Sequence, residues 1–129
     1  MEANELMIGD WVYNTFNEQN EQVRAIGFKF VTLSYNDLYE YDDITPISLT
    51  KEILEKNGWV YNNEDEKFFP QTWVGGGLML QEADDCGYRI VVTSDYDDED
   101  TNDTPFIIFY VHELQHALML RRIKKEIIL

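Results

Sequence analysis

The sequence predicts an α+β fold, and three observations support this prediction. Short segments rich in β-branched and aromatic residues recur about every 8–12 residues through roughly the first 45 positions. Residues 50–57 carry both a start and a stop signal for a helix. A second helical pattern covers residues 111–122. Separate groups of strands and helices are typical of α+β proteins.

The N-terminal segments are expected to form a small β unit. A first strand is expected within residues 6–14, entered through a turn at Gly9 and Asp10, and the polar residues 14–20 suit a hairpin connection. The further expected strands are residues 22–30, 31–35 and 39–44. Because short strands at this spacing are typical of a small barrel, residues 1–48 are predicted to form an SH3-like β-barrel unit.

Residues 49–129 are predicted to form a helix, an antiparallel sheet and a C-terminal packing helix. Thr50 is a good N-cap, and Gly58 permits the left-handed conformation that ends a helix. The expected strands are residues 59–61, 67–70, 78–81, 88–93 and 105–111. The last two alternate poorly, which indicates burial on both faces or a central position.

The C-terminal helix, residues 111–122, is expected to cover this sheet. Residues 123–129 would extend that helix or form a last strand. We expect the two parts, 1–48 and 49–129, to form one compact globule.

The charge balance excludes some classes of partner. The chain has 129 residues with 25 acidic and 10 basic side chains, a formal charge of −15. Such a surface repels phosphate backbones, which argues against direct nucleic-acid binding. The longest apolar run, residues 106–111, is far shorter than the ~20 residues that span a bilayer, and no leader is visible. With one cysteine, the sequence is typical of a cytoplasmic protein.

The densest acidic segment, residues 95–103, predicts a solvated loop. It does not fit a calcium loop, since Asp100 and Phe106 stand where an EF-hand needs Gly and Glu. A role in mimicking nucleic-acid charge stays open. Residues 75–77 are three glycines without the Lys-Ser/Thr end of a P-loop, and they predict a flexible turn.

One motif has the spelling of a zinc-hydrolase site. Residues 112–116 read His-Glu-Leu-Gln-His, which matches H-E-x-x-H. Two imidazoles four residues apart on a helix can hold one Zn²⁺, and the intervening glutamate can activate a metal-bound water. In this alternative, His112 and His116 are metal ligands, Glu113 is the catalytic base and zinc is the cofactor.

The surrounding sequence argues against that alternative. A catalytic zinc needs a third protein ligand, but Met119 and Arg122 stand where the longer metzincin signature has Gly and His. Glu126 is the sole carboxylate downstream. The two histidines share a helical face with Met119 and Ile123, which is expected to pack against the sheet. We therefore favour no catalytic residue, no cofactor and no bound metal.

Cys86 is the other candidate nucleophile. It follows Asp84 and Asp85, whose negative charge raises the pKa of a thiol and opposes activation. No Gly-x-Ser-x-Gly nucleophile elbow is present in the sequence. The residues therefore favour a non-enzymatic protein.

Three stretches, residues 4–12, 41–59 and 110–118, give the chain a family resemblance. In order and spacing it resembles small uncharacterised proteins of Bacteroides-type gut bacteria and their phages and mobile elements. Their C-terminal motif commonly reads Tyr-x-His-Gln-Leu-Gln, whereas this chain has Glu113 where the first Gln is usual. The resemblance implies an intracellular setting and carries no activity.

The sequence thus predicts an acidic cytoplasmic accessory or interaction protein of phage or mobile-element origin, which binds a protein partner. The alternative is a small zinc-dependent hydrolase. The identity of the partner, the binding surface and the oligomeric state do not follow from the residues.

Overall fold

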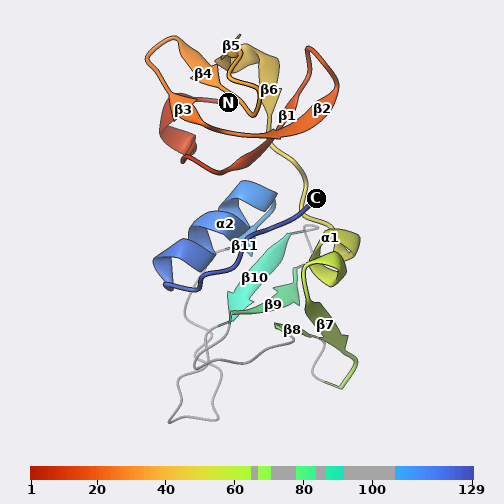
Figure 1. The fold of residues 1–129 in the computed structure, drawn as a ribbon. Coiled ribbons are helices and arrows are strands. Elements are labelled where there is room, and N and C mark those ends of the chain that lie inside the picture. The colour runs from red at the N-terminus through yellow and green to blue at the C-terminus, as the bar shows by residue number, and fades with distance from the viewer. Residues whose placement is uncertain (65–66, 71–77, 84–86, 92–106) are drawn as a thin grey trace. The chain divides into compact units, whose positions relative to one another are not determined.

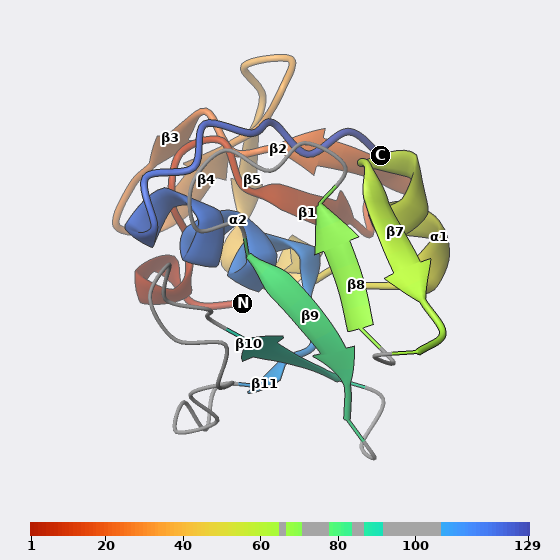
Figure 2. The same cartoon turned by 90° about the horizontal axis from the view of Figure 1, so that it is seen from below.

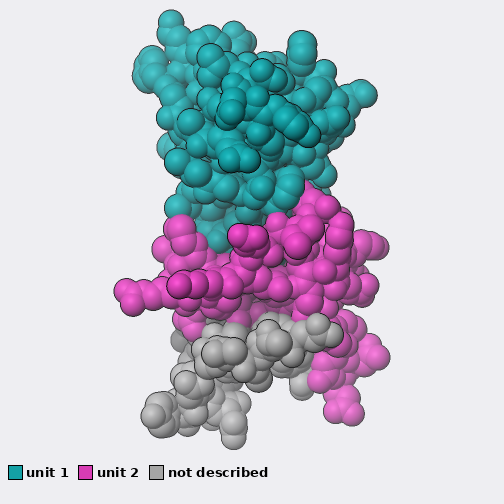
Figure 3. All heavy atoms as spheres, in the orientation of Figure 1, with its two compact units in different colours: residues 1–48, 110–117 teal, residues 49–109, 118–129 magenta. Residues whose placement is uncertain are grey.

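The computed structural model describes residues 1–64, 67–70, 78–83, 87–91 and 107–129 (Figure 1). The predicted glycine turn at 75–77, Cys86 and the acidic segment 95–103 lie outside these residues. The chain divides into two compact units, coloured in Figure 3. Unit 1 comprises Met1–Ser48 and Tyr110–Ala117, and unit 2 comprises Leu49–Phe109 and Leu118–Leu129. The start of the last helix therefore belongs to unit 1, although the sequence analysis placed it with the second part.

Unit 1 is built from two small antiparallel sheets. Their strand orders are β2-β1-β6 and β3-β4-β5. The elements are η1 (Ala3–Glu5), β1 (Trp11–Asn14), β2 (Gln19–Gln22), β3 (Ala25–Ile26), β4 (Phe30–Thr32), β5 (Leu38–Glu40), η2 (Tyr41–Asp43) and β6 (Ile44–Thr45). The Arg24 N–H donates to the Thr32 carbonyl at 2.8 Å, so the pairing with β4 begins one residue before β3. The described strands form no closed barrel.

The hydrophobic core cluster of unit 1 includes buried members from both sheets, and all of its buried members are aliphatic. Its buried members are Leu6, Val12, Val23, Val31, Leu33 and Ile44. Met1, Tyr39 and Tyr41 pack against this cluster with part of their surface exposed. At about 1.5–3 kcal/mol for each buried aliphatic side chain, this cluster is the main stabilising contribution within the unit.

Two expected strand boundaries in unit 1 are wrong. The predicted strand 22–30 is interrupted, because the chain turns at residues 27–29 and the Gly27 N–H donates to the Phe30 carbonyl at 2.9 Å. A Cβ at Gly27 would lie 2.9 Å from the same carbonyl oxygen, so this tight approach requires glycine. The predicted strand 39–44 is split by the 3-10 turn η2.

Unit 2 contains a five-stranded antiparallel sheet in the order β11-β10-β9-β8-β7, and Figure 2 shows β9, β8 and β7 as arrows side by side. The strands are β7 (Trp59–Asn62), β8 (Lys67–Pro70), β9 (Met79–Glu82), β10 (Tyr88–Val91) and β11 (Ile107–Ile108). Trp59 is buried, and its indole N–H donates to the Leu78 carbonyl at 3.1 Å. Phe68 packs edge-on against Tyr88 with ring centroids 6.0 Å apart.

Helix α1 (Lys51–Lys56) confirms the predicted helix and both of its end signals. The Thr50 hydroxyl accepts from the Ile53 N–H at 3.3 Å, and Gly58 adopts φ 91°. Asn57 is buried at the end of the helix and binds both the N–H and the carbonyl of Ile128, at 2.7 and 2.8 Å. This side chain therefore attaches the C-terminal segment to α1.

Four expectations for the C-terminal part are wrong. Strand β11 has two residues and lies at the edge of the described sheet, not at its centre. Helix α2 (Val111–Leu120) ends two residues early, and residues 123–129 form neither a helix nor a strand. Met119, expected to be packed, is half exposed.

Arg122 explains the early end of α2. It adopts φ 57°, its N–H donates to the Met119 carbonyl, and the Ile123 N–H donates to the Leu118 carbonyl, each at 2.9 Å. This pair of bonds is the Schellman ending, in which glycine usually occupies the left-handed position.

We expect Arg122→Gly to raise the free energy of unfolding by about 1 kcal/mol, because glycine relieves the left-handed strain of an L-residue. Arg121→Gly is the matched control, since it removes the same charge from a residue without positive φ. That control should lower the free energy of unfolding by roughly 0.5–1 kcal/mol. Urea unfolding followed by circular dichroism measures the free energy of unfolding of both variants. Equal effects in the same direction would contradict the view that Arg122 is strained by its left-handed conformation.

Candidate functional site

Helix α2 carries the three residues of the predicted zinc motif. The structure brings His112 and His116 together on one helical face, with ring centroids 5.5 Å apart and the planes nearly perpendicular. Glu113 lies one residue beyond His112, in the first turn. All three belong to the part of α2 within unit 1.

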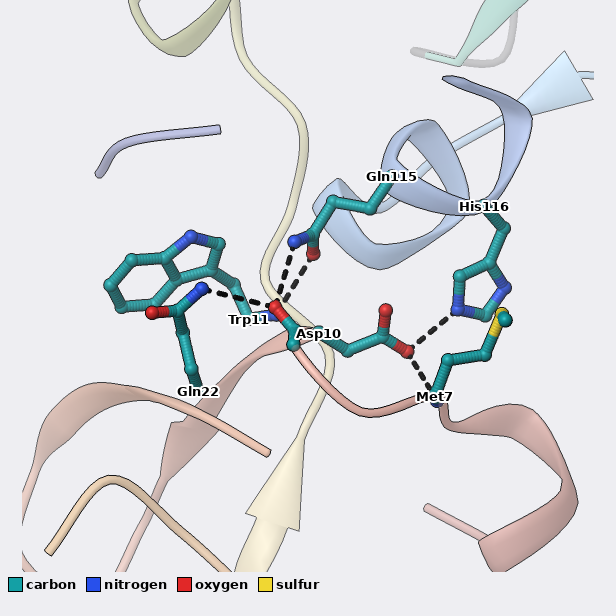
Figure 4. Close-up of polar contacts among 7 residues, drawn as sticks. Met7, Asp10, Trp11, Gln22, Gln115 and His116 are labelled. Carbon is teal, nitrogen blue, oxygen red and sulfur yellow. Dashed lines mark hydrogen bonds and ion pairs between the residues drawn. The ribbon is translucent and has the colours of Figure 1, made fainter. Parts of the chain in front are cut away.

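His116 is bound to Asp10. Its Nε2 lies 2.6 Å from Asp10 Oδ2, and the Asp10 side chain is almost completely buried (Figure 4). The same carboxylate oxygen accepts from the Met7 N–H at 2.8 Å. Asp10 thereby connects the turn before β1 to helix α2, and the Nε2 lone pair or proton of His116 is engaged within the protein.

Gln115 connects the helix to the same turn through both ends of its side-chain amide. Its Oε1 accepts from the Trp11 N–H at 2.8 Å, and its Nε2 donates to the Gly9 carbonyl at 2.9 Å (Figure 4). The Gly9 carbonyl also accepts from Gln22 Nε2 at 3.1 Å. Gly9 has φ 96°, so glycine is favoured at this turn. The amide of Gln115 pairs with the backbone of residues 9 and 11 much as a neighbouring strand would.

His112 is buried, and its Nδ1 has no hydrogen-bond partner among the residues that the structure describes. Its ring stacks on Tyr110 at 5.8 Å with an angle of 14° between the planes. Burial lowers the pKa of His112, because removal from water disfavours the charged imidazolium, and the carboxylate of Asp10 opposes this only in part. The neutral form of His112 is thus the one that the folded state favours.

Glu113 caps the helix. Its Oε1 accepts from the Tyr110 N–H at 3.1 Å, in the manner of the acidic member of a capping box. This bond satisfies an N–H that has no partner inside the helix. A glutamine oxygen can accept the same bond, because a capping box takes either Glu or Gln at this position.

The geometry gives no metal centre in the part of the chain that is described. There, no group of three or more His, Cys, Asp or Glu side chains is arranged to hold a metal ion. The side chains of Asp10, Gln115 and His116 form hydrogen bonds that join helix α2 to the turn of residues 7–11.

A second surface of unit 1, not anticipated from the sequence, exposes apolar side chains. Val31 in β4 is buried and faces Ile26 and Tyr39 in register, so Phe30 and Leu38 lie on the opposite, solvent side of the sheet. Phe30 is 43% exposed, and Phe28 in the β3–β4 turn is 95% exposed. Residues 25–32 are rich in hydrophobic side chains, and this pattern predicts a buried strand as well as it predicts an exposed apolar surface.

Comparison with known proteins adds no information on the role of either surface. No family model, no curated protein and no solved structure matches the chain. Within the described residues, no helix has the length and apolarity needed to cross a membrane.

We expect Gln115→Ala to lower the free energy of unfolding by about 2 kcal/mol, since two hydrogen bonds to the turn are lost at about 1 kcal/mol each. Gln22→Ala removes a single bond to the same Gly9 carbonyl and should cost about half as much. Hydrogen exchange at the Trp11 amide should accelerate in Gln115→Ala and change little in Gln22→Ala. Equal exchange in the two variants would contradict the role given to Gln115.

Stability should fall as the pH drops below the usual His pKa of about 6.5, because the unfolded state takes up the His112 proton before the folded state does. The contribution of neutral His112 to the free energy of unfolding is fully present above the pKa of the unfolded state. It declines as the pH falls toward the lowered pKa of His112 in the folded state. His112→Asn should flatten this part of the profile. Urea unfolding between pH 5 and pH 8 tests it, and an identical slope in the variant would rule out His112 as the cause.

Proposed function

We propose that this chain is a non-enzymatic, acidic interaction protein that binds a protein partner in the cytoplasm, and that it is of phage or mobile-element origin. The origin and the setting rest on the resemblance of residues 4–12, 41–59 and 110–118, and the setting also on the single cysteine. The partner role rests on the apolar surface of unit 1. Its oligomeric state is left open.

The observation that carries the proposal is the exposure of Phe28, Phe30 and Leu38 on one three-stranded sheet of unit 1. Phe30 and Leu38 are diagonal neighbours across β4 and β5, within reach of one another on the solvent side. Aromatic side chains exposed in such a group mark interaction sites more often than isolated apolar residues do. A protein partner that covers them gains the free energy of removing this apolar area from water.

We further propose that unit 1 is an SH3-like β-barrel unit. The supporting features are its chain order and its pairing. Strands β1 and β2 form one antiparallel hairpin, and β3, β4 and β5 form two more. The 3-10 turn η2 follows β5, and β6 returns to pair with β1. This places the first and the last strand of the unit side by side, as closure of a small barrel requires.

The contacts of the zinc motif support the non-enzymatic assignment. His116 is bound to Asp10, and Glu113 accepts from the Tyr110 N–H. Both side chains thus have structural roles that account for their presence. The zinc hydrolase, with His112 and His116 as ligands and Glu113 as base, is retained as the alternative that the experiment below must exclude.

We expect Glu113→Gln to leave both stability and partner binding unchanged, because glutamine also accepts from the Tyr110 N–H. Glu113→Ala, which cannot cap, should lower the free energy of unfolding by about 1 kcal/mol. The measurements are urea unfolding and affinity capture from host cells with each variant as bait. A captured protein retained equally by wild type and Glu113→Gln supports the proposal.

Metal analysis of the protein purified without a His tag or chelator tests the alternative in parallel. Stoichiometric zinc that is lost in His116→Ala, together with a hydrolytic activity lost in Glu113→Gln, would favour the zinc hydrolase. In that case the interaction proposal is wrong.

A further inference from the structure

The hairpin of residues 24–30, here named the cationic hairpin, differs in charge from the rest of unit 1. Arg24 and Lys29 are the two Lys or Arg residues of unit 1, and both lie in this hairpin. The ten Asp and Glu residues of the unit all lie outside it. A small positive surface with aromatic side chains is therefore set into an otherwise acidic unit.

Every residue of the cationic hairpin is exposed. Phe28 stands at the turn with 95% of its surface open, and Lys29 follows it directly. Among the described residues, no ion pair is recorded for Arg24 or Lys29. The hairpin thus offers an exposed aromatic side chain next to Lys29 in sequence, with Arg24 as a second exposed cation in the same hairpin.

The hairpin is also held in one conformation. The Gly27 N–H donates to the Phe30 carbonyl at 2.9 Å, and the Arg24 N–H donates to the Thr32 carbonyl at 2.8 Å. The Tyr41 hydroxyl, from η2, donates to the Gly27 carbonyl at 2.5 Å. Because the turn is already ordered, a partner that binds it has a smaller loss of conformational entropy to overcome.

We propose that the cationic hairpin is the docking element for a protein partner whose surface has an apolar pocket rimmed by Asp or Glu side chains. This inference rests on the proposed function and names the chemistry of the partner. Phe28 enters the pocket, since buried aromatic anchors dominate the energy of protein interfaces. Arg24 and Lys29 face the carboxylates of the rim and select the partner by charge.

The charge distribution favours a small acidic rim over an extended anionic ligand. Two cations match a few carboxylates grouped around one pocket. A nucleic-acid strand or an anionic membrane extends beyond the hairpin, where the carboxylates of unit 1 would repel it. The same repulsion disfavours an acidic partner docked anywhere else on the unit, so the hairpin also fixes the orientation of the complex.

The test is a selection of random dodecapeptides displayed on phage, with the full chain as bait. Phe28→Ser serves for counter-selection. We expect the enriched peptides to combine Asp or Glu with large apolar residues. Their affinity, measured by fluorescence anisotropy, should fall about tenfold or more in Phe28→Ser and in Lys29→Glu, and it should fall with rising salt.

Matched controls separate the hairpin from general effects of hydrophobicity and charge. Ile8→Ser removes an exposed apolar side chain of unit 1 outside the hairpin, and Lys124→Glu reverses an exposed cation in unit 2. Both should bind the selected peptides like wild type. Circular dichroism of each variant checks that the fold is retained.

Several results would overturn the inference. These are a selection without hairpin-dependent peptides, enrichment of basic peptides, or equal affinity in Phe28→Ser and wild type. Phe28-dependent binding to phosphatidylserine vesicles or to a poly-dT oligonucleotide would assign the hairpin to a membrane or to nucleic acid instead. If affinity capture gives a partner that Phe28→Ser binds as well as wild type, the proposed function stands and only the role of the hairpin is wrong.

Discussion

Unit 1 depends on the attachment of helix α2 to the turn of residues 7–11. Helix α2 supplies Gln115, which accepts from the N–H of Trp11, and His116, which binds the carboxylate of Asp10. Asp10 is nearly buried, so its charge has lost most of its water. A buried carboxylate without such partners costs several kcal/mol, which makes the helix a structural requirement of the β unit.

This attachment joins parts of the chain that are far apart in sequence. Trp11 and Gln115 are separated by 104 positions, so unit 1 cannot complete this contact until both ends of the chain are present. Contacts of this range close a long loop, which has an entropic cost that local contacts do not have. The N-terminal β strands of unit 1 are therefore expected to reach full stability only when residues 110–117 are in place.

Some features that depend on residues close together in the sequence were predicted correctly, and contacts that depend on more distant residues were not. Helix α1 is specified by Thr50 and Gly58 within a few residues, and both signals act as expected. The turn at Gly27 was missed because the surrounding residues are aromatic and β-branched, and only the close approach to the Phe30 carbonyl identifies the glycine as a turn residue. Glu21 is buried and accepts from the amides of Asn14 and Asn17, whereas acidic residues are usually solvated. No local sequence pattern predicts that Glu21 binds the two asparagine side chains.

Three side chains of the segment His112–His116 have structural contacts within unit 1. Glu113 is an acceptor at the third helical position, where a capping box takes either Glu or Gln. His116 lies one full turn after His112 and faces the Asp10 carboxylate, which gives the second histidine a partner of its own. Gln115 is held by the backbone of the turn. The structural contacts of the segment are thus separate, one at the cap of the helix and two at the turn of residues 7–11. The reach of a general base is set by hydrogen-bond distance, and at that distance Glu113 Oε1 has the Tyr110 N–H.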